Sequence, residues 1–195
     1  PKYSSDQIRP DITALRQLGE NVTNSTAFLF RPQIATRVRW SMYTDTPLPP
    51  EEPAGQNPPD GAIIDYYLQT DAQEVQLEIL DQMGTVIRKF SSKDEPEAFD
   101  PNDLPYPMFW IRPPMILSPK KGMQRFVWDL HYPPPQGARR SHPISAIQRN
   151  TAAGPLGPWV QPGTNVIRLN VDGKSYTQPL TVRLDPRAKI SKADL

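Results

Sequence analysis

Alternating apolar and polar positions recur along this 195-residue chain and predict strands far more often than helices. The alternation is clearest at 74–80, where Val75, Leu77 and Ile79 are expected to point inward. The stretch 61–70 is apolar on both faces, which favours a central strand that is covered on both sides. The predicted strands lie at 26–30, 35–40, 61–70, 74–80, 85–90, 125–130, 166–171 and 175–184.

Two short turns predict β-hairpins between neighbouring strands. Residues 81–84 (DQMG) follow the strand at 74–80 and end in glycine, as hairpin turns often do. Asp172 and Gly173 follow the strand at 166–171, and this dipeptide is a strong signal for a two-residue hairpin turn. The second hairpin therefore closes the chain's strand pattern, which ends at 185–187 (DPR).

A short helical turn is predicted near the N-terminus. Ile12, Leu15 and Leu18 recur at a three-residue spacing, and Asp11 is suited to cap the turn. Residues 1–40 are interpreted as an arm with the first strands, and the family resemblance given below implies that they link this region to a preceding domain.

Prolines punctuate the pattern. The chain contains 25 of them, and they cluster between the predicted strands. Because proline lacks the N–H group that a central ladder needs, these clusters mark loops. Two of the loops are long insertions, at 91–119 and 133–161. The first carries apolar residues that we expect to pack back on the sheet, partly as an edge strand. These residues are Tyr106, Met108, Phe109, Trp110 and Ile111.

Together these patterns predict an all-β fold. We expect an immunoglobulin-like or fibronectin-III-like β-sandwich with long proline-rich loop insertions and a short N-terminal helical arm. The sandwich is placed at 41–187, and 188–195 is expected to be a C-terminal tail with too little apolar pattern to fold alone. Trp128 is expected to be the buried tryptophan of the sandwich, on one strand face with Phe126 and Leu130.

Composition excludes several classes of function. The formal net charge is +1, and short basic pairs do not form the stripe that a nucleic-acid or anionic-membrane partner would need. The chain has no cysteine, which excludes disulfides and cysteine-based metal sites or nucleophiles. No apolar run reaches the ~18 residues of a membrane-spanning helix.

Few residues suggest chemistry. Asp129 and His131 lie two apart, hence on one face of a strand, and such a pair could act in acid–base catalysis or bind a metal. No third ligand or nucleophile accompanies them, so we favour a structural role at the strand end. Asp100, Asn102 and Asp103 offer oxygen ligands for calcium, but they lack an EF-hand pattern and fit an Asx turn beside a proline better.

Loop carboxylates and loop aromatics suggest two further possibilities. Glycoside hydrolysis needs a carboxylate pair, and none stands out among Glu51, Glu52, Asp94, Glu95 and Glu97. Loop aromatics can stack on sugar rings or on a partner protein, although closing the ends of the sandwich is the more common role. The loop aromatics here are Tyr106, Phe109, Trp110 and Trp159. We therefore assign no catalytic, cofactor-binding or metal-binding residue and expect no cofactor.

Three segments carry a family resemblance: 77–90 (LEILDQMGTVIRKF), 122–130 (GMQRFVWDL) and 162–187 (PGTNVIRLNVDGKSYTQPLTVRLDPR). In this order they resemble the C-terminal immunoglobulin-like region of bacterial sortilin-like, BNR-repeat β-propeller proteins, which are often labelled glycosyl hydrolases. More distantly they are similar to the immunoglobulin-like module of flagellar hook-capping proteins. Residues 11–17 (DITALRQ) resemble the segment where that family's chain leaves the propeller. One departure is Asn165, where the family has a tyrosine that packs locally.

The resemblance implies that this chain is a segment of a larger bacterial protein that is secreted or periplasmic. The leading hypothesis is a non-catalytic accessory and interaction domain that packs against or orients a β-propeller, or mediates assembly. Its expected partner is a propeller or another domain of the same parent protein. One alternative is a carbohydrate-binding module that uses the loop aromatics to hold a glycan. The other is a hydrolase whose site lies in the long loops.

Overall fold

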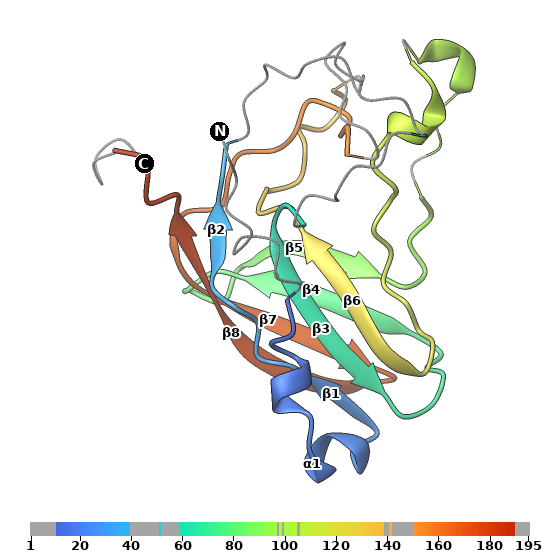
Figure 1. The fold of residues 1–195 in the computed structure, drawn as a ribbon, viewed down its shortest axis with the longest axis vertical. Helices are drawn as coiled ribbons and strands as arrows, with labels where there is room; N and C mark the ends of the chain where they lie inside the picture. Colours follow the sequence, from blue (N-terminus) through green and yellow to red (C-terminus); the bar gives the residue numbers. More distant parts are fainter. Residues whose placement is uncertain are drawn as a thin grey trace.

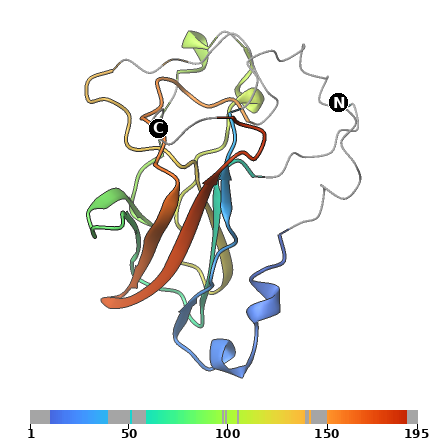
Figure 2. The same ribbon diagram turned by 90° about the vertical axis from the view of Figure 1, so that its left-hand side faces the viewer.

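In the computed structural model the chain forms two β-sheets packed face to face (Figures 1 and 2). The structure describes residues 11–39, 51, 59–96, 98, 100–104, 106–138, 141 and 150–189. Within these residues the helical content is one short α-helix, α1 (Glu20–Thr23), and three single 3₁₀ turns. The turns are Leu15–Gln17, Pro101–Asp103 and Met108–Trp110. The prediction of an all-β sandwich is thus confirmed.

The smaller sheet has three antiparallel strands in the order β1-β3-β6. They are β1 (Ala27–Leu29), β3 (Ala62–Leu68) and β6 (Gly122–Trp128). Strand β3 lies between the other two, as its two apolar faces predicted. Its inner face joins the core, and its outer face carries the buried Asp65, whose partner is described below.

The larger sheet has five strands in the order β2-β8-β7-β4-β5. They are β2 (Ala35–Arg37), β8 (Lys174–Leu184), β7 (Gly163–Val171), β4 (Val75–Leu80) and β5 (Val86–Ser91). All pairings are antiparallel except that of β2, which runs parallel to β8. The chain therefore changes sheets between β1 and β2, and the strand order is that of an immunoglobulin-like sandwich with a divided first strand.

The core lies between the two sheets. Val75, Leu77 and Ile79 of β4 are completely buried, as the alternation predicted. Trp128 is also buried, and its indole N–H donates a hydrogen bond to the His131 carbonyl at 3.1 Å. The tryptophan therefore fills the core and satisfies its one polar group at the point where β6 ends.

Both predicted hairpins are present. Asp172 (φ 46°) and Gly173 (φ 85°) form the two-residue turn between β7 and β8, where left-handed conformations match the twist of the strands. The Asp172 carboxylate also accepts the backbone N–H groups of Gln73 and Glu74, at 3.0 and 2.9 Å. This aspartate therefore fastens the β3–β4 connection to the hairpin.

The residues of the N-terminal arm that pack against the sheet are not the ones that form its three-residue apolar pattern. Ala14 and Val22 form a small core with Phe30, and partly buried Phe28 and Tyr67 on the outer face of the smaller sheet complete it. Ile12, Leu15 and Leu18 are instead exposed. The helical turn was predicted, but the side of the turn that faces the sheet was not.

The described residues within 100–112 of the first insertion and 150–160 of the second lie at the end of the sandwich opposite α1 (Figure 1). Tyr106 and Ile111 are buried in a separate cluster, in which the Ile111 segment bridges to Thr151 of the second insertion. The Arg112 N–H donates to the Thr151 carbonyl at 2.8 Å. The expectation that this apolar group packs on the sheet was wrong for these residues, because the prolines around them favour short 3₁₀ turns over an edge strand.

Candidate functional site

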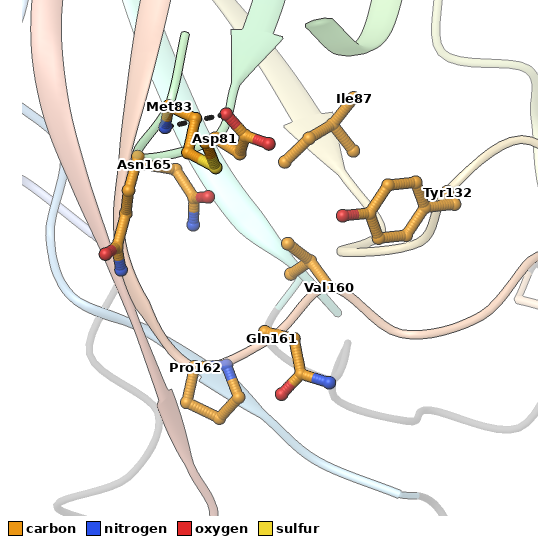
Figure 3. Close-up of a pocket in the computed structure, with 9 residues that line it drawn as sticks. Asp81, Met83, Ile87, Tyr132, Val160, Gln161, Pro162 and Asn165 are labelled. Carbon is orange, nitrogen blue, oxygen red and sulfur yellow. Dashed lines mark hydrogen bonds between the residues drawn. The ribbon is translucent and has the colours of Figure 1, made fainter. Parts of the chain in front are cut away.

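A surface pocket of about 200 Å³ lies at the insertion end of the sandwich (Figure 3). Three parts of the chain build it: the β4–β5 turn with the start of β5, the base of the second insertion, and the start of β7. The lining residues are Asp81, Gln82, Met83, Ile87, Tyr132, Val160, Gln161, Pro162 and Asn165.

The β4–β5 turn forms one rigid wall. One oxygen of the Asp81 carboxylate accepts the N–H groups of Met83 and Thr85, each at 2.8 Å. Gly84 has φ 83°, which the turn requires and which most side chains would oppose. The Gln82 side chain lies over Gly163, where an added Cβ would come within 2.4 Å of its amide nitrogen.

The base of the second insertion forms the opposite wall. Here the two ends of the loop are joined, since the Tyr132 N–H donates to the Pro158 carbonyl at 2.9 Å and the Val160 N–H to the Leu130 carbonyl at 2.8 Å. Gly157 permits this approach, because a Cβ there would lie 2.1 Å from the Tyr132 carbonyl oxygen. The pocket wall is therefore held by backbone bonds although it belongs to a long loop.

Two arginines of the larger sheet brace this wall from behind. Arg37 donates to the Val160 carbonyl at 2.9 Å, and Arg88 donates to the Tyr132 carbonyl at 3.2 Å. Burial lowers the pKa of the Arg37 guanidinium below its usual value. Neither arginine lines the pocket. Their guanidinium groups instead stabilise the wall through hydrogen bonds to its backbone carbonyls.

Asn165 is the unusual residue of the pocket. It lies on the inward face of β7, opposite Leu180 of β8, and is only 4% exposed. Its Nδ2 group is buried without a hydrogen-bond partner. An unpaired buried amide destabilises a fold by about 1–3 kcal/mol, so such groups call for an explanation.

Sequence reasoning did not find this pocket. Its one signal was Asn165 itself, a polar residue in the inward phase of a strand and the named departure from the resembling family. The other lining residues come from three distant segments, and nothing in their local patterns indicates that they meet.

The tryptophans proposed as a sugar platform are engaged within the protein. Trp159 stacks on His131 with 3.8 Å between ring centroids, and the Arg37 guanidinium lies 5.6 Å from the indole centroid. The ring of Trp110 packs against those of Tyr106 and Phe109, with 5.4 and 6.0 Å between ring centroids. Of the four loop aromatics, Phe109 is the one that is largely exposed.

Asp129 and His131 end β6 in a compact turn. The His131 N–H donates to the Asp129 carboxylate at 3.2 Å, while the His131 ring Nδ1 lies 2.7 Å from the Asp129 backbone carbonyl. His131 is buried, and neither residue lines the pocket. Both residues therefore make local contacts in the turn that follows β6.

Two of the remaining candidate carboxylates take local roles. Asp100 accepts the Asn102 N–H at 2.9 Å, which is the expected Asx turn, and Asp94 accepts the Ser91 N–H at 2.7 Å. Glu52 and Glu97 lie outside the described residues, as does the Asp103 side chain. In the described part of the chain, no group of three or more acidic or histidine side chains is placed to hold a metal ion.

No family model, curated protein or solved structure matches this chain. The resemblance to the immunoglobulin-like region of β-propeller proteins therefore rests on its sequence motifs. Among the residues that the structure describes, no helix is long and apolar enough to cross a membrane.

Proposed function

We propose that this chain is a non-catalytic interaction domain of a larger extracytoplasmic protein and docks on a neighbouring domain of that protein through its N-terminal arm. The observation that carries the proposal is an exposed aliphatic surface, here called the arm surface. It consists of Ile12, Leu15, Leu18 and Ile34, which are 42%, 56%, 44% and 54% exposed.

Several polar contacts hold the arm surface in place. The Gln17 side chain both donates to the Arg31 carbonyl at 2.9 Å and accepts the Arg31 N–H at 3.0 Å. The Gln33 side chain donates to Asp11 at 2.7 Å, which joins the arm to the segment that carries Ile34. The exposed aliphatic residues are therefore presented by an ordered segment, and an ordered surface loses less entropy on docking.

Single exposed aliphatic residues are ordinary on protein surfaces, but here three lie within seven residues of the arm and the fourth, Ile34, lies on a segment joined to it. Groups of exposed apolar residues are typical of interaction sites. The nature of the partner is supported by the sequence. Residues 11–17 resemble the segment where the family's chain leaves its propeller, so a domain of the same parent protein is the expected occupant.

Hydrogen exchange on the native gene product tests this proposal. We expect the amides of 12–18 to exchange more slowly in the native product than in the isolated 195-residue chain, because the partner domain covers them. Leu18→Ser should remove that protection. Leu156→Ser is the matched control, since Leu156 is 42% exposed and lies in the second insertion, and it should leave the protection intact. Equal exchange in both proteins would refute docking through the arm surface.

The two alternatives find less support. The carbohydrate-binding hypothesis relied on the loop aromatics, of which Trp110 and Trp159 make ring contacts within the domain. The hydrolase hypothesis required either a pocket with two close carboxylates or a cavity shared by Asp129 and His131. The pocket described above has one carboxylate among its described lining residues, that of Asp81, and neither Asp129 nor His131 lines it.

A further inference from the structure

The pocket shares no residue with the arm surface, so docking through the arm does not explain it. We propose that it binds a neutral polyhydroxylated ligand the size of one pyranose ring, such as a terminal sugar residue. The argument comes from its volume, its unpaired donor, its acceptors and its walls.

The volume limits the ligand. Since one water occupies about 30 Å³ of liquid, a pocket of this size holds roughly six waters or one ligand of about a dozen non-hydrogen atoms. A single pyranose has this size. A longer oligosaccharide would leave the pocket after its first ring.

The polar groups require a ligand that both accepts and donates. The buried Asn165 Nδ2 is a donor without a partner. We propose that a rotation of the Asn165 side chain brings this donor to an acceptor on the ligand. The Asp81 carboxylate offers acceptor capacity, and in Figure 3 the Tyr132 hydroxyl points toward the side of the pocket that holds Asp81. Hydroxyl groups donate and accept at the same atom, so a polyol can satisfy all three.

The charges exclude other ligand classes. Among the described residues that line the pocket there is no lysine, arginine or histidine, while Asp81 contributes a carboxylate, so an anion is disfavoured. A hydrocarbon would leave the Asn165 donor unpaired. Ile87, Val160 and Pro162 provide an aliphatic wall that suits the C–H face of a sugar ring.

This site differs from the glycan site expected at the loop aromatics. It uses an inward strand residue, the β4–β5 turn and the base of the second insertion, and none of its described lining residues is a tryptophan. A ring of about a dozen atoms held in such a pocket is expected to bind with a Kd in the millimolar range.

Amide NMR titration of the full chain with D-glucose, D-galactose and D-mannose tests the inference. At least one sugar should produce saturable shifts of the Gln82 and Met83 backbone amides and of the Asn165 side-chain amide. Tyr132→Phe removes only the hydroxyl and should weaken binding about two- to tenfold. Asn165→Leu should abolish it, because methyl groups replace the amide.

The matched control is Asn170→Leu, on the outward face of the same strand, which should bind as the native chain does. The inference is overturned if none of the three sugars gives saturable shifts, or if the shifts persist in Asn165→Leu. It is also overturned if n-butylammonium chloride saturates the pocket while every sugar fails. None of these results bears on docking through the arm surface, which hydrogen exchange tests separately.

Discussion

We expect the ion pair between Asp65 and Arg125 to be the main electrostatic interaction that holds the N-terminal arm against the smaller sheet. Arg125 Nε and its terminal nitrogen lie 2.8 and 2.9 Å from the two oxygens of Asp65. The same terminal nitrogen donates to the Asp11 carbonyl at 2.9 Å, which connects the outer face of the smaller sheet to the arm. The hydrogen bonds that Arg125 donates to the Asp65 carboxylate raise the pKa of Arg125 above its usual value.

Removing the arginine should leave a buried carboxylate without its cation. Breaking a buried pair costs about 3–5 kcal/mol, and breaking an exposed one about 0–1 kcal/mol. The Asp65 side chain is 7% exposed and that of Arg125 is 41% exposed, so the pair lies between these limits. We expect Arg125→Met to lower the free energy of unfolding by about 2 kcal/mol and the Tm by roughly 4–8 °C.

A double-mutant cycle with Asp65→Leu separates the pair from its surroundings. In the double variant both charges are absent. Its loss of unfolding free energy should therefore be smaller than the sum of the two single losses by about 1 kcal/mol or more. Chemical denaturation measures each free energy, and hydrogen exchange should show faster exchange at 12–18 in Arg125→Met. Additive single effects within about 0.5 kcal/mol would refute the reasoning. Lys120→Met, at an exposed ion pair with Asp71, should change neither measurement.

Three further predictions concern the pocket and the end of the last strand. Asn165→Leu removes the unpaired donor and should stabilise the ligand-free chain by about 1–2 kcal/mol, while a lower Tm would contradict the unpaired state of that amide. Gly157→Ala should destabilise the chain by about 2 kcal/mol through contact with the backbone, whereas Gly154→Ala, with its nearest neighbour 3.9 Å from the new Cβ, should have little effect in thermal unfolding. Hydrogen bonds from Arg187 lower the pKa of Asp185 to about 2. The contribution of the ionised carboxylate to stability is therefore fully present above the ordinary pKa of 3.8 and is lost as the pH falls through about 2. Carboxyl NMR should show that midpoint, and Arg187→Gln should return it toward 3.8.

Sequence patterns succeeded where partners are close along the chain. The β4–β5 hairpin follows from two alternating segments and a short turn, because strands joined so closely have few other ways to pair. The same holds for β7 and β8, whose Asp172-Gly173 turn adopts the expected left-handed conformations. Inward residues such as Leu77 could be named because alternation assigns a face before any partner strand is known.

Patterns failed where a side chain's environment is made by distant segments. The apolar residues of the first insertion meet Thr151, about forty positions later, and no local periodicity points to that contact. The arm's three-residue spacing predicted a turn, yet Ala14 is the residue that packs inward. For the pocket, Asn165 could be noticed as unusual, but its surroundings could not be derived.

The all-β class, the two hairpins and the inward faces of their strands can thus be read from residue order alone, since alternation and turn chemistry act over a few residues. The sheet change between β1 and β2, the exposure of the arm surface and the pocket around Asn165 depend on how the two sheets and the two insertions pack together. Packing is decided by contacts between residues far apart in the chain, where many arrangements share the same local pattern and only the folded whole selects one.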